Sequence, residues 1–116
     1  MVNTRAKGGR IQRKLVEELK VLGWNVAIVE RGGRFLKEKD AFGLFDICAV
    51  KGHITKWIQI TCNRPHKHTP YLSFAKQHGH HKQHIEQYVW YDHKGWKVFK
   101  YTWDMGKIID DRRRKN

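Results

Sequence analysis

Two short stretches of the chain combine oxygen-bearing side chains with apolar neighbours. The first contains Asp40 and Asp46, and the second contains Gln59 and Thr61, which flank Ile60. Asp46 lies between two apolar residues, where an unpaired carboxylate would be costly to bury. Because Mg²⁺ prefers oxygen ligands, a divalent cation would be a suitable partner for this carboxylate. The alternative is that Asp46 caps backbone groups at a strand end, and that Gln59 and Thr61 are ordinary surface residues of a strand.

A β-hairpin is predicted to bring these side chains together. Residues 40–50 and 54–62 are two apolar runs on either side of a short turn that contains Lys51 and Gly52, a pattern typical of an antiparallel hairpin. Side chains alternate between the two faces of a strand. In the second run, this alternation places Ile58, Ile60 and Cys62 on one face and Trp57, Gln59 and Thr61 on the other.

Helices are predicted before and after this hairpin. Apolar residues at helical spacing predict a helix over residues 10–22 that ends at Gly23. Residues 24–30 are predicted to form a strand, the second half of residues 71–87 a helix, and residues 88–91 and 96–103 a second hairpin. The predicted fold is therefore an α/β fold with a mixed sheet of about five strands and helices on its faces. The apolar stripe of the first helix consists of Ile11, Leu15, Leu19 and Leu22.

The 116 residues suffice for one domain. We expect this domain to span residues 10–108, with a basic arm at residues 1–9 and a basic tail at residues 109–116. No apolar run approaches the roughly 18 residues of a membrane span, and no apolar signal core follows the first residues. Cys48 and Cys62 fall in predicted strands, so we expect reduced core cysteines in a cytoplasmic protein.

The charge of the chain points to a polyanionic partner. Lys and Arg total 24 against 11 Asp and Glu, which gives a net charge of +13 and a pI near 10.1. Nucleic acid is the partner that such an excess favours; the alternative is the solvated surface of a ribosome-associated or thermophilic protein. The residues expected to contact nucleic acid are Arg5, Lys7, Arg10, Arg31, Arg34, Lys37, Lys39, Arg64, Lys67 and Lys76.

Histidines concentrate between His66 and His84. On a helix, His80 and His84 would be four residues apart and could share one zinc ion. However, the sequence has no His-Glu-x-x-His pattern, and neither cysteine has ligand spacing. We therefore prefer a polar, partly cationic segment near phosphates, and a zinc-binding or RNA-binding protein remains a weaker alternative.

The order of elements, with Asp-x-Phe-Gly-x-x-Asp over residues 40–46 and Gln-x-Thr over residues 59–61, resembles the PD-(D/E)XK or restriction-endonuclease-like nuclease superfamily. Within it, the chain is similar to archaeal-type Holliday junction resolvases and to small phage or mobile-element proteins. The likeness covers about residues 8–90 and implies an αβββαβ core. It implies that Asp46, Gln59 and the Ile60 carbonyl bind Mg²⁺ or Mn²⁺, and that Thr61 occupies the position of the family's lysine.

The chain departs from the family pattern at three positions. Gln59 stands where the family has an acidic residue, Thr61 replaces the lysine, and Gln12 stands at the position of the first-helix Glu of the resolvases. Asp40 would supply part of the missing negative charge, as in the phage-like pattern. The basic residues that would replace the lysine are Arg64, Lys39 and Lys76.

The resemblance implies a small DNA endonuclease, acting as a homodimer on branched or junction DNA. The alternative is a catalytically degenerate protein of the same fold that holds structured DNA without cleaving it. The three neutral substitutions favour this alternative. Metal uptake and strand cleavage would separate the two hypotheses.

Overall fold

Six strands form one mixed sheet in the order β1-β2-β3-β4-β5-β6, and two helices accompany it. The structure is a computed structural model that describes residues 4–29, 42–104 and 106–112, and the side chains of residues 8–29, 42–104 and 106–110. Strands β3 and β4 are parallel, and the other neighbouring strands are antiparallel. The α/β prediction is confirmed, with six strands where about five were expected. The elements are α1 (Thr4–Val21), β1 (Asn25–Ile28), β2 (Ile47–Lys51), β3 (Ile54–Cys62), α2 (Thr69–His78), β4 (Gln83–Tyr91), β5 (Gly95–Tyr101) and β6 (Ile108–Arg112).

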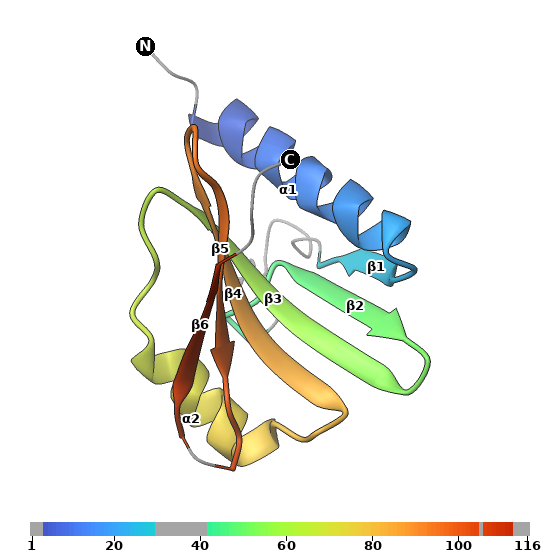
Figure 1. Ribbon diagram of the computed structural model, residues 1–116, viewed down its shortest axis with the longest axis vertical. Helices are drawn as coiled ribbons and strands as arrows, with labels where there is room; N and C mark the ends of the chain where they lie inside the picture. The colour runs from blue at the N-terminus through green and yellow to red at the C-terminus, as the bar shows by residue number, and fades with distance from the viewer. Residues whose placement is uncertain (1–3, 30–41, 105, 113–116) are drawn as a thin grey trace, which may run out of the picture.

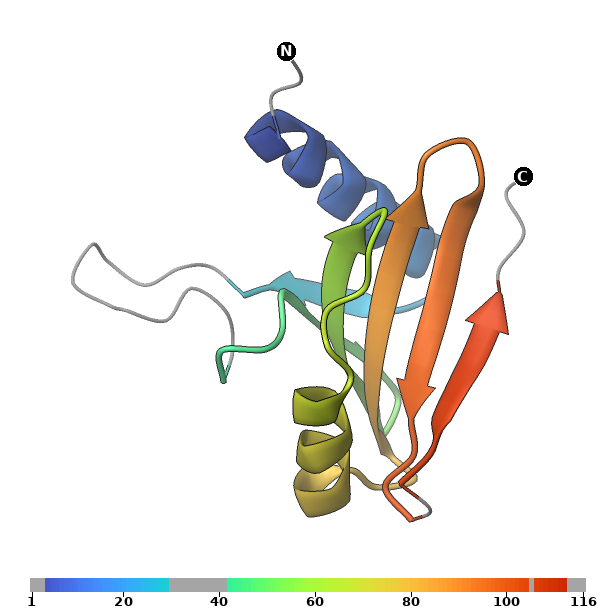
Figure 2. The same cartoon turned by 90° about the vertical axis from the view of Figure 1, so that its left-hand side faces the viewer.

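Each face of the sheet carries its own hydrophobic core and its own helix. Along β3, Ile58 belongs to the core that includes α1, whereas its neighbour Trp57 packs against the core that includes α2. Along β4, Tyr88 and Val89 divide in the same way. We call these the α1 face and the α2 face. The helices also lie at opposite ends of the molecule, over a strongly twisted sheet (Figures 1 and 2).

Helix α1 confirms most of the predicted apolar stripe but starts earlier than expected. Its backbone is helical from Thr4, so it includes most of the segment predicted to be a basic arm. Leu15 and Leu19 are fully buried, whereas Leu22 is exposed because it lies beyond the last helical turn. Gly23 ends the helix with a φ of 95°, a conformation that costs glycine little. On the core side, the indole N–H of Trp96 on β5 donates a 2.7 Å hydrogen bond to Glu18 of α1.

Both predicted hairpins are confirmed as antiparallel pairs, β2 with β3 and β4 with β5. The predicted alternation in β3 is also confirmed. Ile58, Ile60 and Cys62 contribute to the core of the α1 face, and Trp57 contributes to that of the α2 face. Gln59 and Thr61 share the parity of Trp57, so they lie on the α2 face.

The position predicted for the second helix is wrong. The helix occupies Thr69–His78, and the residues expected to be helical enter β4 at Gln83. Pro70 lies in the first turn, where its fixed φ favours a helix start. The helix ends at Gly79. A Cβ there would approach the Ala75 carbonyl oxygen to 2.5 Å and Trp103 Cβ to 2.7 Å, so a larger residue would not fit without a shift of its neighbours.

This change removes the basis of the zinc alternative. His80 forms an isolated bridge with Gln83, and His84 lies in β4, so the two histidines are not on one helix. Within the described parts of the chain, no three His, Cys, Asp or Glu side chains are grouped to hold a metal ion.

The C-terminal segment also differs from the expectation. Strand β6 runs through Ile108–Arg112 and so enters the segment predicted to be a tail. Asp110 forms a 3.2 Å ion pair with Lys97 of β5. Cys48 and Cys62 are free thiols, and burial raises the pKa of Cys48. None of the helices in the described residues has the length and apolar character needed to cross a bilayer.

Candidate active site at the end of the β2 and β3 ladder

The Asp46 carboxylate lies where regular pairing between β2 and β3 stops. The last paired residues are Ile47 and Ile58. One residue further, the Asp46 N–H donates to the Ile58 carbonyl at 2.9 Å, and the Ile60 N–H donates to Asp46 Oδ2 at 3.0 Å. The side chain of Asp46 therefore takes the place that a backbone carbonyl would occupy in a continuing ladder. This is the backbone-capping role that the sequence left open.

The Gln59 side chain bonds the other backbone polar group of the same residue, Ile60. Its Nε2 donates to the Ile60 carbonyl at 3.3 Å, a long hydrogen bond within the strand. Residues Asp46, Gln59 and Ile60, which the sequence assigns to one metal site, thus meet at one point. Asp46 binds the N–H of Ile60, and Gln59 binds its C=O.

Two buried oxygen atoms at this point have no hydrogen-bond partner among the described residues. They are Oε1 of Gln59 and Oγ1 of Thr61. The two residues are only 5% and 8% exposed. A buried polar atom without a partner costs about 1–3 kcal/mol. Two such atoms on one strand face are therefore unusual in a small core and are consistent with a ligand that would complete their bonding.

Gln87 is a buried amide on the same face whose oxygen and nitrogen both form hydrogen bonds. It pairs directly with Gln59 across the parallel β3 and β4 ladder and is fully buried. Its Oε1 accepts the His66 N–H at 2.6 Å, and its Nε2 donates to the Tyr101 hydroxyl at 2.8 Å. Burial raises the pKa of Tyr101 to about 12, and the bond from Gln87 partly opposes this rise. The Gln87 amide therefore fastens the loop after β3 to the sheet.

Other predicted site residues lie elsewhere. Gln12 is partly buried on α1, which covers the opposite face of the sheet from Gln59, so the structure does not bring it to the Gln59 side. Arg10, Arg64, Lys67 and Lys76 have exposed side chains. Arg5 and Lys7 lie in α1, but their side chains are outside the described part of the structure. The residues that lie wholly outside the described ranges are Arg31, Arg34, Lys37, Lys39 and Asp40.

The sequence reasoning missed a buried ion pair on the α1 face. Lys56 Nζ lies 3.3 Å from Oε1 of Glu86, and the two side chains are only 10% and 1% exposed. The Lys56 ammonium also lies 4.8 Å from the centroid of the Trp24 ring. The only sequence signal was a charged residue within an otherwise buried strand, because the two partners are 30 positions apart.

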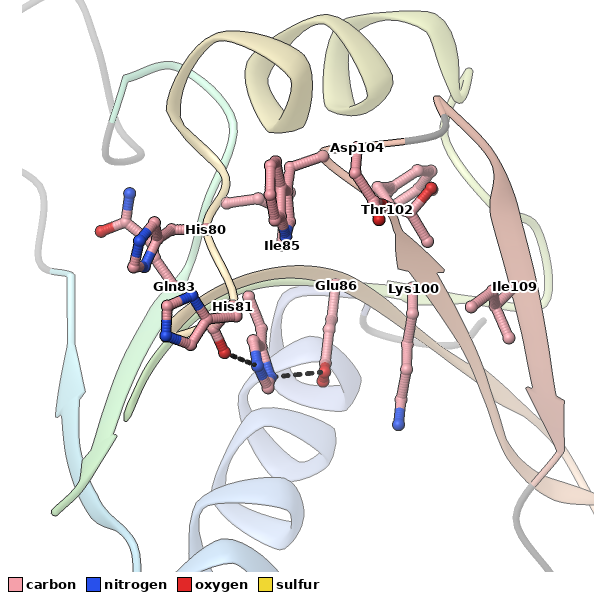
Figure 3. Close-up of a pocket in the computed structure, with 12 residues that line it drawn as sticks. His80, His81, Gln83, Ile85, Glu86, Lys100, Thr102, Asp104 and Ile109 are labelled. Atoms are coloured by element: carbon pink, nitrogen blue, oxygen red, sulfur yellow. Dashed lines mark hydrogen bonds and ion pairs between the residues drawn. The ribbon is translucent and has the colours of Figure 1, made fainter. Parts of the chain in front are cut away.

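This ion pair borders a pocket of about 200 Å³ at the end of the sheet where β4 begins and β5 ends. Figure 3 shows Glu86 and Lys100 extending in the same direction from neighbouring strands. His84 approaches Oε2 of Glu86 to 4.0 Å and the His81 carbonyl to 3.0 Å. The carboxylate of Glu86 is thus paired with Lys56 within the protein, and it also lines this pocket.

Comparison with known proteins adds no family assignment to this geometry. No protein-family model matches the chain, and no curated protein matches it.

Proposed function

We propose that this protein is a divalent-metal-dependent DNA endonuclease with a restriction-endonuclease-like core. The proposed substrate is branched DNA such as a four-way junction, bound by a homodimer. The observation that carries the proposal is that Asp46 and Gln59 both bond the backbone of Ile60, one its N–H and the other its C=O, where the β2 and β3 ladder ends. The observed order of one helix, three strands, one helix and further strands agrees with the αβββαβ core that the resemblance implies.

The donor set fits Mg²⁺ or Mn²⁺ in chemical kind, because every candidate ligand atom is an oxygen. Asp46 and Gln59 would hold the cation together with the Ile60 carbonyl. Oε1 of Gln59 is the clearest candidate ligand atom, because it has no hydrogen-bond partner among the described residues. A bound divalent cation would supply positive charge at the phosphate and lower the pKa of a water molecule. With one charged ligand among the described residues, binding would be weak until the substrate phosphate adds its own oxygens.

The remaining residues would position the DNA. The hydroxyl of Thr61 is one strand repeat beyond Gln59 on the same face and would contact a water molecule or a phosphate oxygen. Arg64 lies two residues after the end of β3 and is exposed, so we choose it among the described cations as the candidate to replace the missing lysine. The excess of 13 positive charges would hold the DNA backbone, with a strong dependence on salt.

The proposal is tested by cleavage of a labelled four-way junction and of a plasmid in Mg²⁺ or Mn²⁺. Asp46→Asn keeps an oxygen that can accept the Ile60 N–H but removes the charge. We expect this variant to bind DNA in EDTA like the parent protein and to lose cleavage by at least about a hundredfold. Asp110→Asn, which changes an exposed carboxylate on β6, is the matched control and should cleave normally. Equal cleavage by Asp46→Asn and the parent protein would overturn the assignment.

A second candidate is a protein that holds structured DNA without cleaving it. It is favoured by the fact that the Asp46 carboxylate already accepts the Ile60 N–H and that the Ile60 carbonyl already accepts from Gln59. Titration calorimetry with Mn²⁺, with and without DNA, separates the two candidates. Tight, salt-sensitive DNA binding without metal uptake or cleavage would select this second function.

A further inference from the structure

An aromatic pocket lies on the α2 face beside the candidate active site. It has a volume of about 170 Å³ and is lined by Phe42, Trp57, Phe74, His78 and Gln83. The ring of Phe42 lies 5.4 Å from that of Trp57 and 5.3 Å from that of Phe74, measured between centroids. Three of these five residues are Phe or Trp, and polar groups come from Trp57, His78 and Gln83.

The polar groups of the pocket hold its walls in place. Gln83 Oε1 accepts the indole N–H of Trp57 at 3.4 Å, and Gln83 Nε2 donates to the His78 carbonyl at 2.6 Å. Because the Gln83 amide bonds at both ends, it ties Trp57 of β3 to the end of α2. The Trp57 ring is thus fixed before any ligand arrives, which reduces the entropy cost of binding.

Phe42 is the residue that core packing explains least. Its side chain is 61% exposed, and its backbone has a φ of 56°. A bulky residue in the left-handed region carries a strain of order 1 kcal/mol or more. Strained positions of this kind concentrate at ligand-binding sites. An exposed ring held in a strained turn, against two other rings, is better explained by stacking on a ligand than by folding.

The pocket and the candidate active site are neighbours on one strand. Trp57 of the pocket and Gln59 of the site are two residues apart in β3 and lie on the same face, a separation of roughly 7 Å. A nucleotide joins its base to its phosphate through a single sugar, so one nucleotide would reach from one to the other. Phe42 likewise leads, through a short turn, to Asp46.

We propose that this pocket holds one unpaired nucleobase of the bound nucleic acid, with the attached phosphate at Asp46 and Gln59. The occupant is inferred from the aromatic lining, the short distance to the candidate phosphate site and the strongly basic chain. Stacking on aromatic rings tolerates any base, so the pocket reads the absence of a pairing partner and not the sequence. This inference rests on the proposed DNA-binding function and deepens it, because it selects DNA with unpaired nucleotides.

The test compares two duplexes that differ at one unpaired position, which carries either a thymine or an abasic site. Dissociation constants are measured by fluorescence anisotropy in EDTA, so that cleavage plays no part. We expect the parent protein to bind the thymine duplex at least about fivefold more tightly. Phe42→Ala should remove this difference, and Phe42→Tyr, which keeps a stacking ring, should retain it. Trp103→Ala, which removes another exposed aromatic ring outside the pocket, is the matched control and should also retain it.

Several outcomes would overturn the proposal. These are equal binding of the two duplexes by the parent protein, an unchanged preference in Phe42→Ala, and an equal loss on both duplexes in that variant.

A change of oligomeric state in Phe42→Ala, measured by sedimentation, would instead assign the pocket to a second copy of the chain. If the parent protein cleaves the four-way junction but binds the thymine and abasic duplexes equally, only the assignment of the pocket to a nucleobase is wrong. A parent protein that binds no DNA would overturn the pocket and the proposed function together. A urea midpoint near that of the parent protein shows that Phe42→Ala is folded.

Discussion

The two faces of the sheet both bury polar side chains, but they satisfy them differently. On the α1 face, Lys56 and Glu86 form an ion pair with each other, although without a well-aligned hydrogen bond at Glu86 Oε1. On the α2 face, the oxygens of Gln59 and Thr61 are buried to a similar degree and have no hydrogen-bond partner among the described residues. Burial of a polar group therefore does not distinguish a structural pair from a candidate site here.

The difference lies in what each face requires from outside the protein. The α1 face pairs the charge of Glu86 with that of Lys56. The α2 face combines unpartnered oxygens with an exposed aromatic pocket, so a ligand would improve both its polar and its apolar contacts. The comparison predicts that substitutions on the α1 face change stability, whereas substitutions at the α2 site change binding or cleavage.

The largest expected effect on stability is that of Glu86→Ala. This change leaves the ammonium of Lys56 buried and unpaired, so the free energy of unfolding should fall by about 3–5 kcal/mol. Urea denaturation followed by far-UV circular dichroism measures it. The double variant Lys56→Met with Glu86→Leu should recover most of the loss, because both charges are removed. A single variant as stable as the double variant would show that the ion pair is not the cause.

A smaller effect is expected within the α2 face, from the pair of glutamines that lie side by side. Gln87→Met removes the side-chain partner of the His66 N–H and one of the two partners of the Tyr101 hydroxyl, so it should lower the free energy of unfolding by about 1–3 kcal/mol. Gln59→Met removes an oxygen without a partner and one long hydrogen bond, so its effect should stay within about 1 kcal/mol. Urea midpoints of the two variants provide the measurement. Equal losses would mean that Gln59 is as well satisfied as Gln87.

A further effect is a dependence of stability on pH that arises from Tyr101. Because its pKa is raised to about 12 in the folded protein, the unfolded chain releases this proton first as the pH rises. The contribution is fully present below pH 10 and is lost between about pH 10 and pH 12. Tyr101→Phe should therefore show a shallower loss of stability over this range than the parent protein, measured by urea denaturation at each pH. Parallel curves for the two proteins would refute the assignment.

The parts of the fold that the sequence predicted correctly depend on local signals. The alternation in residues 54–62 and the turn at Gly52 define the β2 and β3 hairpin. The position of the second helix also depends on local signals, a start at Pro70 and a stop at Gly79. The residues between Gly79 and Ile85 include several histidines and no apolar residue. The start of β4 therefore lacks the apolar–polar alternation that predicts a strand.

The parts that could not be predicted depend on partners distant in the sequence. Glu86 is buried beside Lys56 only because β3 and β4 pair in parallel, with α2 between them. Strand β6 has two apolar residues followed by charges, and its pairing with β5 defines it as a strand. The capping role of Asp46 likewise depends on where β2 stops pairing with β3, which no single-strand pattern reveals.

The hydrogen bond between Glu18 and Trp96 joins residues 78 positions apart, and this has a consequence for synthesis of the chain. Helix α1 leaves the ribosome before the strands, but part of the core that covers its apolar stripe is contributed by Trp96 and Val98 of β5. In a nascent chain halted before β5, the apolar stripe of α1 would therefore be covered only in part. The N-terminal element is thus completed by one of the last strands to be translated.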